Sequence, residues 1–480
     1  MAKKIRDKAV SGVKWTTIEK ISTQILRFVI GIIVARLVTP ADYGLIAMLA
    51  IFTSIGDVFI NSGFNTALIR NKENTQADYS TAFFFNVGVG MAVYLILFLC
   101  APLIASFYDI PELLDVTRLY TLTLLIGSLS VVQIAKLTHE FRFKLQFFVN
   151  LISLIASGAA GILMAVKGYG VWALVWQGLT YTVLRTVLFW LCSGWHPILV
   201  FSRKSFNYLF SFGSKLLIVN IVDIIYENVY TLVVGKYYSA SSAGFYNRSL
   251  QIAQLPKSVI TEIVNKVMLP LLAPYQDDKE VLIAVYNRII RLVVFVTYPL
   301  LVLLVVLAKP IIFIMLGEPW LPAAPYLQIL SLSVIFSMLS NININLLYVK
   351  GRSDIILKID IQKKLLGFLI VIIMVPLGLY WICFGTILYA IFAFIINCHQ
   401  TKKILDFGFL SQVKSIIPAL TYSAIIGGVV YFVSMFFSSS FLQIIIGGVL
   451  GMALYILLTS IVKDPSFNEL LNIVKKQYGK

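Results

Sequence analysis

Long runs of apolar residues alternate with short charged or Pro- and Gly-containing breaks along the whole chain. Most runs are about 20 residues long, the length of helix that crosses roughly 30 Å of hydrocarbon. They predict membrane-spanning helices near 15–38, 81–105, 114–135, 147–166, 171–191, 209–234, 289–308, 323–347, 360–379, 381–398, 415–436 and 441–461. Two further helix-length stretches, 42–68 and 244–273, are more polar, so hydropathy alone does not decide whether they cross the membrane.

The basic residues of the predicted loops decide this question. If both polar stretches cross, the loops on one side hold most of the lysines and arginines, and the loops on the other side keep only Arg36, Arg118, Lys167, Lys236 and Lys309. Leaving out either stretch reverses the side of every later loop and removes this bias. The positive-inside rule then places both termini in the cytoplasm. We therefore predict an all-α polytopic membrane protein with about 14 transmembrane helices.

The chain also contains an internal repeat. Shifted by about 200 residues, the segment 36–44 lies over the segment 236–244, and both begin with a basic residue and end with a glycine. Further along, at an offset of about 208, prolines match in the two copies: Pro102 with Pro310 and Pro111 with Pro319. The change of offset places the additional residues in a cytoplasmic loop, where insertions are tolerated.

The repeat predicts two lobes of six helices each. The N-lobe takes residues 1–204, the C-lobe takes residues 205–400 in the same orientation, and two further helices with a cytoplasmic tail take residues 401–480. Transporters built from parallel repeats place the substrate site between the repeats. We therefore expect the chemistry of this chain to lie where its two lobes meet.

Composition and charge agree with a membrane protein. Of the 480 residues, 59% are hydrophobic and 13% are charged, about half the charged share of a soluble domain. The net charge of +17 could indicate nucleic-acid binding. Because most of the positive charge lies in the predicted cytoplasmic loops, we interpret it as a topology signal and an affinity for anionic lipid headgroups. We expect no nucleic-acid partner.

The sequence lacks the residue patterns that several kinds of chemistry require. The four cysteines lie singly in apolar segments, and the three histidines have no metal-binding spacing, so we expect neither disulfides nor a metal site. The chain has no phosphate-binding GxxxxGK motif, which argues against ATP hydrolysis, and we expect no cofactor. The apolar stretch after the basic N-terminus is too long for a cleaved signal, so we interpret it as a first membrane helix.

Seven basic residues lie inside the predicted spans, namely Lys20, Arg27, Arg185, Lys215, Arg248, Lys257 and Lys266. A charge at the centre of a bilayer costs about 2.5–3.5 kcal/mol on insertion scales, so each should be paired or face an aqueous cavity. Most lie in the first, seventh and eighth predicted helices, which together with the second are partners in the repeat. We predict one net-cationic chamber there and choose its substrate-binding residues as Arg27, Lys215, Arg248, Lys257 and Lys266.

Acidic residues occur in the same helices. Asp223 and Glu227 are four residues apart and share a helix face, and the second helix carries Asp57. We consider Asp223 and Glu227 a candidate ion or proton site. The alternative for Asp223 and Glu227 is simple neutralisation by Lys215 or by the eighth helix. Glu262 and Lys266, also four apart, could form a purely structural pair.

Aromatic residues follow the same segments: Trp15, Phe28, Tyr226, Tyr230, Tyr237, Tyr238, Phe245 and Tyr246. Aromatic side chains gather at both membrane interfaces, which is the simplest interpretation of most of them. The alternative is that some stack on sugar rings in a cavity that opens outward.

The first 85 residues carry a specific resemblance. The segments 12–15 (GVKW), 35–48 (ARLVTPADYGLIAM), 67–69 (ALI) and 81–83 (TAF), together with Asp57 and Gly63, resemble the opening of the WzxC-like polysaccharide exporters. These form the polysaccharide transporter family of the multidrug/oligosaccharidyl-lipid/polysaccharide (MOP) flippase superfamily. Asn61 departs from the pattern, since relatives often carry an acid before that glycine, and ion coupling here would then rest on Asp57, Asp223 or Glu227.

The resemblance implies a central cationic cavity lined by helices 1, 2, 7 and 8. It also implies a non-enzymatic protein of the bacterial inner membrane, which flips undecaprenyl-pyrophosphate-linked oligosaccharide for O-antigen, capsule or exopolysaccharide synthesis. Its expected partners are that lipid-linked substrate, membrane lipids, a coupling H⁺ or Na⁺, and polysaccharide polymerase or assembly proteins.

Two alternatives stay open. A drug exporter of the same superfamily would need an acidic or apolar chamber, whereas here intramembrane bases outnumber acids. A membrane polysaccharide polymerase or ligase would need a long outer loop with acid or arginine clusters, whereas the predicted outer loops are short.

Overall fold

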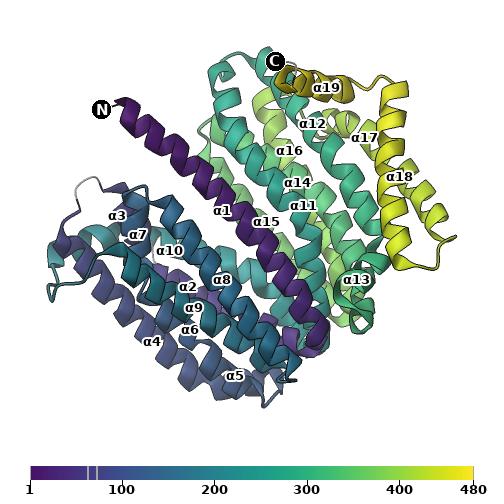
Figure 1. The fold of residues 1–480 in the computed structure, drawn as a ribbon. Helices are drawn as coiled ribbons and strands as arrows, with labels where there is room; N and C mark the ends of the chain where they lie inside the picture. Colours follow the sequence, from purple (N-terminus) through teal and green to yellow (C-terminus); the bar gives the residue numbers. More distant parts are fainter. Residues whose placement is uncertain (1, 62–63, 72–73, 479–480) are drawn as a thin grey trace. The chain divides into compact units, whose positions relative to one another are not determined.

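Helices make up almost all of the protein (Figure 1). The computed structural model describes residues 2–61, 64–71 and 74–478, and within these residues no strand occurs. Nine helical segments of this described part are long and apolar enough to cross a membrane. The predicted all-α, multi-pass membrane architecture is therefore confirmed. The total of 14 spans stays a prediction, because the charged helices that hold the intramembrane bases are not among the nine.

Residues Met1–Gly244 form one compact unit. Its helices are α1 (Ala2–Leu37), α2 (Pro40–Asn61), α3 (Phe64–Arg70), α4 (Gln76–Tyr108), α5 (Leu113–Tyr120), α6 (Leu122–Ser128), α7 (Val131–His139), α8 (Phe143–Val166), α9 (Val171–Ser193) and α10 (Arg203–Tyr237). Helix α8 packs between α1 and α9, and α10 packs on α2 and α4. The interior of this unit is apolar: one core cluster joins Ile30 and Val34 of α1 to Leu154 of α8 and Leu174 of α9.

One predicted span of this unit is broken. The stretch expected as a single helix over 114–135 is divided into α5, α6 and α7. At the first break the Thr121 hydroxyl donates to the carbonyl of Thr117, and at the second the Ser130 hydroxyl donates to that of Gly127. Hydroxyl groups that bond back to the preceding turn compete with the helix and bend it. The breaks therefore follow from small hydroxyl residues that hydropathy does not register.

Residues Phe245–Lys480 form the second compact unit. Helix α11 (Ala240–Leu272) begins in the first unit and continues into the second, followed by α12 (Lys279–Val306), α13 (Ala308–Leu316), α14 (Ala324–Val349), α15 (Ser353–Met374), α16 (Leu379–Leu405), α17 (Phe409–Ser434), α18 (Ser440–Ile461) and α19 (Pro465–Tyr478). Helix α14 packs on α12 and α16, and α17 packs on α12 and α18. The short α19 lies across the ends of α12 and α18 (Figure 1).

A buried polar network supports the second unit. Asn343 of α14 accepts hydrogen bonds through Oδ1 from Thr401 Oγ1 at 2.6 Å and from Gln412 Nε2 at 2.9 Å. Its own amide donates to Gln412 Oε1 at 3.0 Å. All three residues are at most 1% exposed. Since buried polar groups are costly unless hydrogen-bonded, this network fixes the packing of α14, α16 and α17.

The two segments of the sequence repeat have the same local structure. Helix α1 ends at Leu37 and α10 at Tyr237, and α2 begins at Pro40 and α11 at Ala240. The N-lobe and C-lobe boundaries, which rest on this repeat, remain a prediction: the compact units divide the chain within the second copy, after its first helix.

Candidate functional site

Polar and charged side chains from four helices meet inside the first unit. Asn150 of α8 is the central residue: its Nδ2 donates to Glu19 Oε1 of α1 at 2.6 Å, and its Oδ1 accepts from Arg185 Nε of α9 at 2.9 Å. One amide therefore holds an acid and a base at the same time. Asp57 of α2 interacts electrostatically with the same Arg185.

A tyrosine joins a second guanidinium to this group. Arg27 Nη2 donates to the Tyr181 hydroxyl at 3.1 Å, and the Arg27 guanidinium carbon lies 5.3 Å from the centre of the Tyr181 ring. The Arg185 guanidinium lies 6.0 Å from the same ring and 5.3 Å from that of Phe189. Guanidinium groups are attracted to aromatic faces at these distances. Tyr181 thus orients two positive groups beside each other.

We call Glu19, Arg27, Asp57, Asn150, Tyr181 and Arg185 the α1–α9 cluster. It holds two bases and two acids. Within the described residues, the Nη atoms of Arg185 and the carboxylate of Asp57 make no hydrogen bond. Arg27 and Asp57 are exposed and the other four residues are half-buried. The cluster is therefore held by its own contacts and keeps donors and an acceptor available for a ligand.

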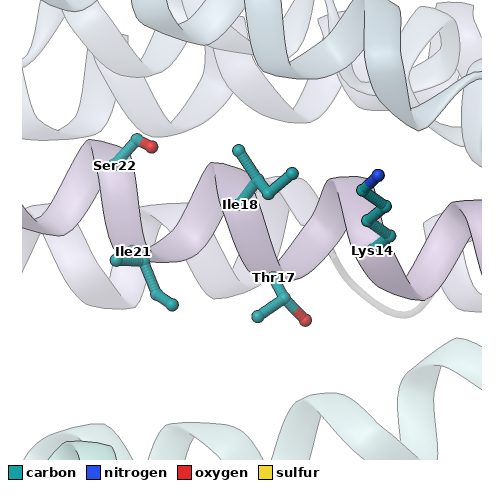
Figure 2. Close-up of a pocket in the computed structure, with 5 residues that line it drawn as sticks. All are labelled: Lys14, Thr17, Ile18, Ile21 and Ser22. Atoms are coloured by element: carbon teal, nitrogen blue, oxygen red, sulfur yellow. The ribbon is translucent and has the colours of Figure 1, made fainter.

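Helix α1 borders open space along the turns that include Glu19. A hollow of about 450 Å³ lies beside it, lined among the described residues by Lys14, Thr17, Ile18, Ile21 and Ser22. Figure 2 shows that the Lys14 ammonium and the hydroxyls of Thr17 and Ser22 project from the helix. Polar groups therefore continue along α1 from the hollow to Glu19 and Arg27.

The predicted bases of α11 have partners on their own helix. Arg248 Nη1 donates to Gln251 Oε1 at 3.0 Å. Lys266 forms an ion pair with Glu262 at 3.1 Å, which is the structural alternative stated for this pair. Lys257 follows Pro256 inside the helix and is half-buried. All three bases belong to the second unit, and their place in one chamber with the bases of the first unit stays a prediction.

The predicted residues of α10 are only partly described. The side chain of Lys215 lies outside the described part of the chain, as does Gly63 of the resemblance motif. Asp223 is half-buried and Glu227 is exposed, and both take part in interactions with other residues. Because α10 packs on α2 and α4, these two carboxylates belong to the same unit as Asp57. Their proposed coupling role stays a prediction.

Three of the aromatic candidates pack within the protein. Tyr230 and Tyr246 are 7% and 2% exposed, and the ring centres of Trp15 and Phe147 are 5.8 Å apart. Tyr230 and Tyr246 are thus not available to stack on a sugar in this state.

Sequence reasoning counted Arg185 among the intramembrane bases but gave it no role, and it missed Asn150 and Tyr181 altogether. Glu19 and Asn150 are separated by 131 residues and Arg27 and Tyr181 by 154. One signal could have found them: Arg185 and Asn150 lie within two predominantly apolar predicted spans. Strongly polar side chains at that depth require partners, so the two residues could have been expected to pair.

Comparison with known proteins identifies the family. The model of a family described as polysaccharide biosynthesis protein matches residues 33–325, more than half of the chain. The chain belongs to this family. It is 27% identical over 358 residues to the teichuronic acid biosynthesis protein TuaB of Bacillus subtilis, covering 73% of each chain. It is also 27% identical over 370 residues to the lipopolysaccharide biosynthesis protein WzxC of Escherichia coli, covering 75% of this chain and 74% of that protein.

Solved structures show the same fold. The lipid II flippase MurJ in an inward closed conformation matches with a TM-score of 0.76 and 15% identity, covering 95% of this chain and 99% of that one. An inward-facing multidrug transporter of the MATE family matches with a TM-score of 0.60, covering 82% and 98%. At such identities the likeness shows the fold alone. The fold and the family match both agree with the family that the sequence resemblance implied.

Proposed function

We propose that this protein flips a polyprenyl-pyrophosphate-linked oligosaccharide from the cytoplasmic to the outer leaflet of the bacterial inner membrane by alternating access. The observation that carries the proposal is the pair of guanidinium groups, Arg27 and Arg185, held beside Tyr181 within one bundle of apolar helices. The names of its relatives, in lipopolysaccharide and teichuronic acid biosynthesis, support a glycan-containing cargo.

The chemistry of the head group explains the need for such a pair. A pyrophosphate is multiply charged and cannot cross about 30 Å of hydrocarbon without compensation. Guanidinium groups bind phosphate oxygens through two parallel hydrogen bonds, with more directional specificity than an ammonium. Asn150 holds Nε of Arg185, which leaves the Nη atoms for the phosphate. The polyprenyl tail stays in lipid while the head group moves, and no covalent bond is formed or broken.

Asp57 could couple the binding of a cation to the binding and release of the substrate. Its carboxylate and the substrate phosphate would compete for the same Arg185 guanidinium. A proton or Na⁺ on Asp57 weakens its attraction for Arg185 and favours phosphate binding, and loss of that cation favours release. Asp223 and Glu227 of α10 are further candidates for the same coupling. Arg248 and Lys257 of α11, with Lys215 and Lys266, are further candidates for contact with the head group.

The test is flipping of a radiolabelled polyprenyl-pyrophosphate oligosaccharide in proteoliposomes. We compare the wild type with Arg27→Gln and Arg185→Gln at equal protein content. Arg118→Gln is the matched control, because Arg118 lies in the same unit, stacks on Phe98 at 4.5 Å and is not a member of the α1–α9 cluster.

We expect both cluster variants to lose most of the flipping and the control to keep it. Unchanged flipping in both cluster variants would move the head-group site elsewhere. A wild type that exports cationic dyes and flips no lipid would instead favour the drug exporter, and a wild type that extends or transfers the glycan would favour a polymerase or ligase.

A further inference from the structure

The segment 194–202, which joins α9 to α10, carries four consecutive apolar side chains on the outside of the protein. They are Ile198 (43% exposed), Leu199 (94%), Val200 (43%) and Phe201 (56%). We call these four residues the apolar tip. A run of large apolar side chains in water is unfavourable, and on a loop it marks a contact with a partner or with a membrane. The apolar tip therefore needs a surface that covers it.

Side chains at the start of α4 hold the backbone of the apolar tip. The Ile198 backbone N–H donates to Ser80 Oγ at 3.0 Å, and the Ser202 backbone N–H donates to Thr81 Oγ1 at 2.9 Å. Ser80 and Thr81 are both fully buried. Because one bond lies at the first residue of the tip and the other directly after its last residue, the tip is held at both ends. Its side chains therefore project from an ordered backbone.

The same segment packs its other large side chain into the protein. Trp195 is 3% exposed, and the centre of its ring lies 6.0 Å from those of Tyr79 and Phe83 on α4. Its Nε1 donates to Gln76 Oε1 at 2.7 Å, and Gln76 Nε2 donates to the carbonyl of His196 at 2.7 Å. The segment is thus well packed up to the apolar tip, and poor packing does not explain the exposure of the tip.

The depth of the apolar tip in the membrane follows from its hydrogen bonds. The apolar run of α4 is predicted to enter the hydrocarbon at residue 81, so Ser80 and Thr81 lie at the edge of the membrane. The backbone of the tip is hydrogen-bonded to these two residues and lies at the same edge. Apolar groups of interfacial segments enter the boundary between headgroups and acyl chains by about 5–10 Å. The side chains of the tip are within reach of this layer.

The charges beside the apolar tip fit the same surface. Arg203 and Lys204 follow the tip directly, and both are exposed. Asp78 of α4 attracts Lys204 electrostatically, so the three residues together keep a net positive charge. The positive-inside rule places this segment on the cytoplasmic side, where basic residues next to the membrane bind the phosphates of anionic lipids.

We propose that the apolar tip inserts into the cytoplasmic leaflet and that Arg203 and Lys204 bind the headgroup phosphates of anionic phospholipids. A lipid leaflet supplies an apolar layer and anionic groups at the depth where the segment presents both kinds of side chain. The insertion sets the depth at which α10 begins, since Arg203 is the first residue of that helix. This inference concerns contact with lipid and does not rest on the identity of the cargo.

The experiment measures the depth of the apolar tip in lipid nanodiscs of phosphatidylcholine and phosphatidylglycerol. The full-length protein carries Leu199→Cys labelled with the fluorophore bimane, in a background with Cys100→Ala and Cys192→Ala. The two remaining cysteines are buried. Quenching by spin labels on the lipid acyl chains reports contact with hydrocarbon, and quenching by iodide reports contact with water.

Two other positions provide reference values. Leu99→Cys places the label inside the predicted span of α4, at a residue that is 72% exposed, and Asp277→Cys places it in the exposed loop before α12. We expect acyl-chain spin labels to quench the label at position 199 nearly as strongly as at 99, and at least about three-fold more than at 277. Iodide should quench it far less than at 277.

Binding of the headgroup is tested with spin-labelled lipids of two kinds. Phosphatidylglycerol should quench the label at position 199 about two-fold more than phosphatidylcholine at equal content. Arg203→Gln combined with Lys204→Gln should remove this difference. The matched control is Lys402→Gln combined with Lys403→Gln, two exposed lysines in the last turn of α16, which should leave the difference unchanged.

A label at position 199 that iodide quenches as strongly as at 277, and that acyl-chain spin labels do not quench, would overturn the insertion and favour a protein partner. Equal quenching by the two lipids, or a preference that survives the charge variant, would overturn the phosphate contact. If the charge variant does not fold, the labelled protein with both bases still tests insertion and lipid preference. Because no cargo is present, a failure to flip lipid would overturn the proposed function and not this contact.

Discussion

Arg185 offers the sharpest test of the α1–α9 cluster. Arg185→Gln removes the positive charge and both Nη donors, and Arg185→Lys keeps a positive charge but loses the planar group that bonds to Asn150 and stacks near Tyr181. An arginine-to-lysine change is not conservative at such a site. The two variants therefore separate the contribution of charge from that of geometry.

The magnitude follows from the bonds lost. A hydrogen bond to a charged group contributes about 1.5–3 kcal/mol, and each 1.4 kcal/mol is about a factor of ten in affinity. Because Arg185 is only half-buried, we take the lower half of this range and expect Arg185→Gln to weaken substrate binding roughly ten- to forty-fold. Arg185→Lys should fall between the glutamine variant and the wild type.

Binding of radiolabelled lipid-linked oligosaccharide to purified protein in detergent measures this effect directly. Asn150→Ala should weaken binding less than Arg185→Gln, since it frees the guanidinium without removing it. In the double variant the effect of Asn150→Ala should nearly disappear, because Asn150 acts through Arg185. Affinities within two-fold of the wild type for Arg185→Gln, with the folded state intact, would refute the reasoning.

Three further outcomes follow from contacts described above. Asp57→Asn removes a negative charge that attracts Arg185; it should raise substrate affinity up to about five-fold, the upper value for exposed charge pairs. It should also flatten the dependence of flipping on pH or Na⁺, and an unaltered dependence would exclude Asp57 from coupling. Tyr181→Phe removes the acceptor for Arg27 and should cost about 1 kcal/mol, seen as roughly five-fold weaker binding, whereas equal affinities would show that the ring alone orients Arg27. Asn343→Ala should lower the thermal unfolding midpoint by more than Asn345→Ala, a control on the same helix whose side chain is only half-buried. The reason is that unpaired buried groups cost about 1–3 kcal/mol each; equal midpoints would argue against the buried network.

The sequence predicted what depends on local pattern. Apolar runs of membrane-spanning length fell on helices throughout the chain, and the repeat matched the positions where α2 and α11 begin, Pro40 and Ala240. The spans follow from the local run of apolar residues, and the helix starts follow from a local break between two helices. The length of α15 shows the limit, since it begins at Ser353, before the expected 360, and buries Lys363 at 6% exposure beside Asp360.

The site depended on contacts that no local pattern contains. Glu19 and Asn150 meet because α1 packs on α8, and Arg185 reaches Asn150 because α8 packs on α9. The sequence shows which span carries a charged residue. It does not show which neighbouring helix that residue faces. It therefore identified Arg27 and Asp57 as functional candidates and overlooked Asn150, which links α1 to α9.

Gly44 and Gly244 each lie against the main chain at the start of the other copy of the repeat, which constrains how both positions can change during evolution. After a duplication, the two copies of a segment are usually free to diverge, and most of the matched positions here have done so. These two glycines cannot drift separately, since a side chain gained in either copy collides with the main chain of the other. We expect the pair to persist in descendants of this gene whose surrounding repeats have become unrecognisable.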